Sequence, residues 1–151
     1  MRIALVMWIG LIGGAAVLGG CGGTSKTSDA DIQILREPEL MKLLDESKAG
    51  VVLVDVRLPG AFAGGHLPGA INIPVAKLNH HSRDPRLGEA GRIVVYGQGW
   101  NDPLSRVGVK KLMVMGFKDV YDFKGGVELW MDTGHPLSRS LDERFARPET
   151  Q

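Results

Sequence analysis

Apolar residues occur along the chain in short blocks whose spacing changes from one block to the next. Val51–Val56 and Arg92–Tyr96 are nearly continuous β-branched runs, a pattern typical of strands buried on both faces of a sheet. Ile32–Leu35, Ala70–Ile73 and Val120–Tyr121 are shorter apolar runs, and we interpret them as strands too. The pattern therefore predicts a sheet in which the two longest strands are central.

Between these runs the apolar spacing becomes helical, as in the i, i+3, i+4 series Leu40, Leu43 and Leu44. The helices predicted in this way are Pro38–Lys48, Pro103–Met115 (closed by Gly116) and Gly126–Thr133. Strands that alternate with helices predict an α/β fold, with a central parallel sheet between two helical layers. Ligands bind outside the carboxyl ends of such strands, so we expect function in the loops Arg57–Gly69 and Gly97–Asp102.

The first twenty residues have a different composition. Arg2 is the only charged residue before Lys26, and an uncharged apolar run follows it from Ile3 to Leu18. A charged start, an apolar centre and small terminal residues are typical of a secretory signal peptide. The run is also shorter than the about 20 residues that a spanning helix needs. We predict a signal peptide over residues 1–20, with an uncleaved membrane anchor as the alternative.

The sequence Leu18-Gly19-Gly20-Cys21 resembles the lipobox of bacterial lipoproteins. The resemblance implies cleavage before Cys21 and attachment of diacylglycerol to its thiol. Residues 21–31 are then the lipidated cysteine and a flexible polar tether. Two or three acyl chains hold a protein on a membrane essentially permanently. We therefore expect the domain at the cell envelope, facing the periplasm or the outer surface, with the membrane as one partner.

Charge and cysteine content exclude several functions. The chain has 18 Lys and Arg against 17 Asp and Glu, so charge gives no reason to expect a nucleic-acid partner. Cys21 is the only cysteine, which excludes an intrachain disulfide and a multi-cysteine metal site within this sequence. His80-His81 with Asp84 could bind a metal, but adjacent histidines supply too few ligands for a closed site. We predict neither a cofactor nor a metal.

Three separated motifs resemble the rhodanese family. Asp55–Arg57 with Gly65–Pro74 matches the family's N-terminal signature, and Gly125–Trp130 matches its C-terminal one. Ile93–Tyr96 matches the strand that leads into the family's active-site loop. The similarity runs from about residue 38 to residue 136 in the family's order, and it implies a rhodanese-like domain over residues 32–138 and a polar tail over 139–151.

The resemblance implies a nucleophilic cysteine in the loop after the central strand, where its thiolate carries sulfur as a persulfide. Gly97 follows the strand directly, and counting back along the helix from Gly116 places Gly99 in that position instead. Both are glycines, so we predict that the chain has no catalytic residue. Ser105 cannot form a persulfide, and the family's phosphatase branch also needs a cysteine.

The loop that lacks the cysteine is the candidate binding site. It consists of Gly97, Gln98, Gly99, Trp100, Asn101 and Asp102, with Ser105 in the first turn of the following helix. Amides of a glycine-rich loop at a helix N-terminus can bind a small anion. However, Asp102-Pro103 has the pattern of an N-cap, and its carboxylate would repel a divalent anion. Trp100 is either a contact for a partner protein or a cover for the space of the missing persulfide.

Three further residues of the motifs are interpreted as supports of the loop. Asp55 at a strand end can pin Arg57, and His66 between Gly65 and Leu67 fixes the loop with its ring. Trp130 is predicted to be a core anchor against the sheet.

Two classes of function remain open. The first is an envelope-anchored, catalytically inactive module that binds an unknown protein partner or a small ligand such as an anion. The second is an enzyme, either a sulfurtransferase that acts with a partner's cysteine or a metal-dependent activity at His80-His81. A structural domain with a decayed site is a third interpretation.

Overall fold

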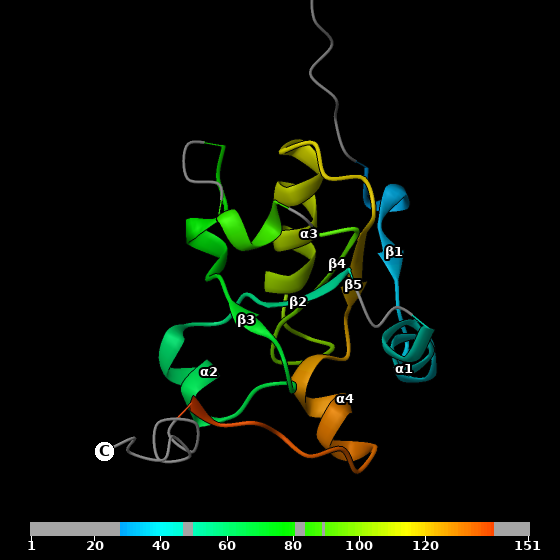
Figure 1. Ribbon diagram of the computed structural model, residues 1–151, viewed down its shortest axis with the longest axis vertical. Coiled ribbons are helices and arrows are strands. Elements are labelled where there is room, and N and C mark those ends of the chain that lie inside the picture. Colours follow the sequence, from blue (N-terminus) through cyan, green and yellow to red (C-terminus); the bar gives the residue numbers. More distant parts are fainter. Residues whose placement is uncertain (1–27, 47–49, 81–83, 89, 141–151) are drawn as a thin grey trace, which may run out of the picture.

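The centre of the molecule is a five-stranded sheet in which every pair of neighbouring strands is parallel. The computed structural model describes residues 28–46, 50–80, 84–88 and 90–140. The strands are β1 (Gln33–Ile34), β2 (Val51–Asp55), β3 (Ile71–Asn72), β4 (Arg92–Tyr96) and β5 (Val120–Phe123), in the spatial order β1-β5-β4-β2-β3. The predicted α/β fold with a central parallel sheet is confirmed (Figure 1). The predicted signal peptide, Cys21 and His81 lie outside the described residues.

Helices cover both faces of this sheet, as the alternating pattern requires. They are α1 (Glu37–Glu46), α2 (Pro59–Gly64), α3 (Leu104–Val114) and α4 (Gly126–Asp132), with 3-10 turns η1 (Asp29–Asp31), η2 (Val75–Lys77) and η3 (Pro85–Leu87). β4 shows how the layers form: Ile93 and Val95 pack on the α3 side, whereas Val94 and Tyr96 pack with α1 and α4. All four side chains are buried, which explains why this strand reads as a continuous apolar run.

The predicted elements occur in the predicted order, with most boundaries shifted by one or two residues, and two differences have a clear physical reason. β5 continues to Phe123, beyond the predicted Tyr121, because Asp122 and Phe123 pair with the last two residues of β4. α2 lies within a segment that was predicted as loop, since six residues are too few to display a helical apolar period. Its one local signal is Pro59 at the first helical position.

The register of the sheet brings the candidate loops to one edge. Asp55 lies opposite Tyr96 on one side and Asn72 on the other, and Tyr96 lies opposite Phe123. The carboxyl ends of four strands therefore coincide, and the loops after β2 and β4 leave the sheet together. β1 begins at the other edge, and Figure 1 shows the described amino-terminal end (blue) far from α4.

Trp130 lies in the core, as predicted: its side chain packs in the α4 layer and is 5% exposed. Within the described part of the chain, no helix combines the length and apolarity needed to cross a membrane.

Candidate functional site

A buried ion pair supports the loop that follows β2. Arg57 Nη2 donates to Oδ2 of Asp55 at 2.7 Å, and its Nε lies 3.1 Å from both carboxylate oxygens. The two side chains are 7% and 0% exposed. Arg57 also donates to the Gly65 carbonyl oxygen at 2.7 Å and to Oε1 of Gln98 at 3.0 Å. One guanidinium therefore ties the loop after β2 to the loop after β4.

His66 belongs to the supporting structure around this pair. Its ring stacks on Phe62 with the centroids 3.7 Å apart, and Nδ1 lies 2.8 Å from the Phe62 carbonyl oxygen. Its backbone exchanges two hydrogen bonds of 2.9 Å with Ser138. Because His66 is only 2% exposed, its ring positions the chain and is not presented to a ligand.

The amino end of α4 holds the candidate loop from the side. The carbonyl oxygens of Gly97 and Gln98 accept hydrogen bonds from the amides of Val127 and Glu128, at 3.2 and 2.9 Å. Gly126 has a φ of +57°, and a Cβ there would overlap the Gly97 carbonyl oxygen. Only glycine meets both demands, which explains the glycine of the C-terminal motif.

Both candidate positions for a nucleophilic cysteine face a carboxylate. A Cβ on Gly97 would stand 2.5 Å from Oδ2 of Asp102. A Cβ on Gly99 would overlap the carboxylate of Glu128, whose Oε1 accepts a hydrogen bond from the side-chain Nε2 of Gln98 at 3.5 Å. An anionic sulfur placed at either position would meet both steric overlap and like-charge repulsion.

Asp102 also occupies amides that a bound anion would need. Its Oδ2 accepts a hydrogen bond from the Gln98 amide at 2.8 Å, and its Oδ1 accepts one from the Leu104 amide at 2.9 Å. Asp102 takes the predicted capping role and Pro103 already has helical dihedral angles, although α3 itself begins one residue later, at Leu104. The capping carboxylate reaches the first helical amide, so an internal anion fills this part of the loop.

A pocket that sequence reasoning missed lies on the α3 side of the loop. Its volume is about 190 Å³, and it is lined by Trp100, Asn101, Asp102, Pro103, Ser105, Arg106, Asp122 and Lys124. Four of the predicted loop residues are therefore gathered at this pocket. Trp100 is 47% exposed and has the Lys124 ammonium 5.9 Å from its ring centroid, whereas the atoms nearest to a Cβ at the two glycine positions belong to Asp102, Ser105 and Glu128.

Asp122 is the unusual member of this pocket. It is fully buried, and neither of its carboxylate oxygens has a hydrogen-bond partner among the described residues. Burial raises the pKa of Asp122, and the neighbouring Ser105 hydroxyl and Arg106 offset this only in part. One signal in the sequence indicates that Asp122 is buried: in the strand sequence Val-Tyr-Asp-Phe, alternation places Asp122 on the same buried face as Val120.

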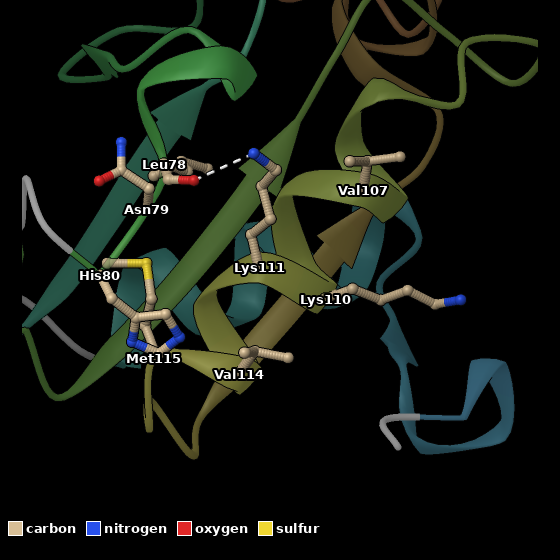
Figure 2. A pocket seen from close by; sticks show the side chains of 8 residues that line it. All are labelled: Leu78, Asn79, His80, Val107, Lys110, Lys111, Val114 and Met115. Atoms are coloured by element: carbon tan, nitrogen blue, oxygen red, sulfur yellow. Dashed lines mark hydrogen bonds between the residues drawn. The ribbon is translucent and has the colours of Figure 1, made fainter. Parts of the chain in front are cut away.

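The histidine pair is not part of this arrangement. His80 lines a separate apolar groove of about 360 Å³ on the outer face of α3, where Lys111 donates to the Leu78 carbonyl oxygen at 3.1 Å (Figure 2). His81 lies outside the described residues. Among those that are described, no three His, Cys, Asp or Glu side chains are grouped as metal ligands.

The parallel sheet and the glycine-rich loop between β4 and α3 define an α/β domain of the rhodanese type. The family model described as "Rhodanese-like domain" matches residues 37–133. This chain belongs to the rhodanese-like domain family.

Relatives and solved structures agree with this assignment. A Pseudomonas putida protein named "Thiosulfate sulfurtransferase GlpE" is 35% identical over 98 residues, which is 65% of this chain and 86% of that protein. The Bacillus subtilis protein YqhL is 33% identical over 99 residues, covering 62% and 75% of the two chains. The crystal structure of the BH2092 protein from Bacillus halodurans superposes with a TM-score of 0.61 at 28% identity, over 69% of this chain and 74% of that one.

Because the Arg57–Asp55 pair is buried, we expect a large loss of stability when the Arg57 guanidinium is removed. Arg57→Met leaves Asp55 buried without its partner, and we expect the free energy of unfolding to fall by about 3–5 kcal/mol. Urea denaturation measures this loss.

The chain contains its own control in a second Asp-x-Arg motif. Arg86 pairs with Asp84 at 2.6 Å, but the two side chains are 52% and 20% exposed. Arg86→Met should therefore cost at most about 1 kcal/mol. Equal losses for the two variants would contradict the role given to the buried pair.

Because the Asp122 carboxylate is buried without a described partner, we expect a pH-dependent difference in stability between the wild-type protein and an Asp122→Asn variant. Because its folded pKa is raised, the wild-type protein loses stability as pH rises from the ordinary value of 3.8 through the folded pKa. Asp122→Asn lacks this loss, so at neutral pH we expect it to be more stable by about 1–3 kcal/mol. Denaturation of both proteins at several pH values measures the difference, and a difference that does not change with pH would refute the assignment.

Proposed function

We propose that this chain is a catalytically inactive rhodanese-like module, held at the cell envelope by a lipid on Cys21, whose loop over residues 97–102 binds a partner. The supporting observation is that both possible nucleophile positions, Gly97 and Gly99, abut carboxylates. The loop has therefore lost the nucleophile and has gained negative charge where a persulfide would be.

The alternative, a sulfurtransferase that uses a partner's cysteine, is favoured by the name of the Pseudomonas putida relative. In that mechanism a thiolate from another protein enters the loop and uses its amides. Asp102 opposes it, because its carboxylate already accepts hydrogen bonds from the Gln98 and Leu104 amides. We therefore prefer binding to sulfur transfer.

The geometry of the domain suits an anchor before its first strand. Asp29, eight positions after Cys21, forms ion pairs with Lys110 at 2.5 Å and with Arg106 at 4.0 Å, which hold η1 against α3. η1 precedes β1 at the amino edge of the sheet, whereas the candidate loop lies at the carboxyl edge. A lipid on Cys21 would leave the loop directed away from the membrane and open to a partner.

Sulfur transfer from thiosulfate to cyanide tests the catalytic part of the proposal. The purified full chain should form thiocyanate no faster than the uncatalysed reaction, while a cysteine-dependent rhodanese serves as the positive control. Gly97→Cys alone should also stay inactive, because the new thiol faces Oδ2 of Asp102. Gly97→Cys with Asp102→Ala removes both the overlap and the repelling charge, so thiocyanate formation above the uncatalysed rate is expected only in this double variant. Turnover by the wild-type chain would refute the proposal.

Metabolic labelling with an alkyne-bearing fatty acid tests the anchor. In a bacterial host the wild-type protein should incorporate label and sediment with membranes, because Cys21 supplies the only thiol of the chain. Cys21→Ser should lose the label, and Ser25→Ala, a change in the same tether, should keep it. Equal labelling of the Cys21→Ser variant would exclude lipidation at this residue.

A further inference from the structure

The pocket between the candidate loop and α3 combines charges of both signs around one aromatic side chain. Asp122 and Asp102 supply carboxylates, and Arg106 and Lys124 supply cations. Trp100 is 47% exposed and lies beside them as an apolar wall. At about 190 Å³ the pocket is smaller than the roughly 300–1,000 Å³ typical of drug-sized ligands, so its ligand is a small molecule.

The Asp122 carboxylate determines which chemical group of a ligand binds deepest in the pocket. Asp102 is already satisfied by two backbone amides, whereas the fully buried Asp122 accepts no hydrogen bond from the residues that the structure describes. Buried polar groups are nearly always hydrogen-bonded, and a carboxylate binds most strongly to a charged donor. The group that approaches Asp122 is therefore a hydrogen-bond donor with positive charge.

The walls of the pocket restrict the rest of the ligand. A simple cation would be repelled by Arg106 and Lys124, and a simple anion by Asp102 and Asp122. Arg106 makes only a loose 4.0 Å ion pair with Asp29, and the Lys124 ammonium lies over the Trp100 ring. Both cations are therefore available to a ligand carboxylate in this pocket.

We propose that this pocket binds a small zwitterion, a free α-amino acid, whose ammonium group pairs with Asp122 and whose carboxylate pairs with Lys124 and Arg106. The proposal rests on the proposed function, in which this loop binds a ligand, and it specifies the ligand's chemical class. The exposed Trp100 indole covers the ligand's aliphatic part.

Isothermal titration of the full chain in detergent, at neutral pH, tests this assignment. The probes are glycine, alanine and serine as zwitterions, methylamine as a cation, acetate as an anion and glucose as a neutral donor. At least one zwitterion should bind about tenfold or more tightly than each of the other three probes. Absence of zwitterion binding, or equal binding of glucose or methylamine, would overturn the proposal.

Three variants locate the binding. Asp122→Asn keeps the shape of the side chain and should weaken zwitterion binding about tenfold or more, and Lys124→Met should weaken it as well. Asp119→Asn removes a carboxylate from the exposed residue before β5, at the other end of the strand, and should leave affinity unchanged. Equal affinity of Asp122→Asn and wild type would reject the pocket.

The two proposals fail in different ways. Thiocyanate formation by the wild-type chain would refute the inactive module, whatever the titration shows. An inactive chain that binds no zwitterion would refute the ligand assignment alone.

Discussion

The carboxyl edge of this domain depends on one buried guanidinium. Arg57 neutralises Asp55 in a region without solvent, and its other donors bind Gly65 and the Gln98 side chain. A buried ion pair is costly unless it is well hydrogen-bonded, and removal of one charged partner leaves an uncompensated buried ion. The loop after β2 and the loop after β4 are therefore positioned together, and the candidate site inherits that rigidity.

On this rigid base the loop after β4 carries a carboxylate at the amino end of α3. Rhodanese chemistry needs an anionic sulfur at a loop of amides, whereas here Asp102 occupies two such amides and Glu128 faces the neighbouring glycine. The Asp102 carboxylate is part of the chain, so it stays at the positive end of the helix dipole, unlike an anion that must bind from solution. Asp102 thus fixes the shape of the loop at the amino end of α3.

The same loop has a second side, and the two sides differ in how well their polar groups are satisfied. Toward Arg57, the Gln98 side chain accepts a hydrogen bond from the guanidinium and donates one to Glu128, which favours a fixed structure. Toward α3, Asp122 is buried without a partner beside Ser105 and the cations of the pocket. An unsatisfied buried carboxylate destabilises the folded state, so its presence is easier to understand where a ligand compensates it.

The sequence by itself determined the fold class, the order of the elements and the absence of a cysteine from the domain. These follow from local signals: β-branched runs, helical spacing and the identity of Gly97 and Gly99. Asp102 lies in the loop itself, so its charge could be placed there from the sequence. Only the tertiary structure decided that Glu128 meets Gly99, because the packing of α4 on the loop brings it from a distant part of the chain. Asp122 shows the same limit: strand alternation places it inside, but only the packed neighbours reveal that its carboxylate has no partner.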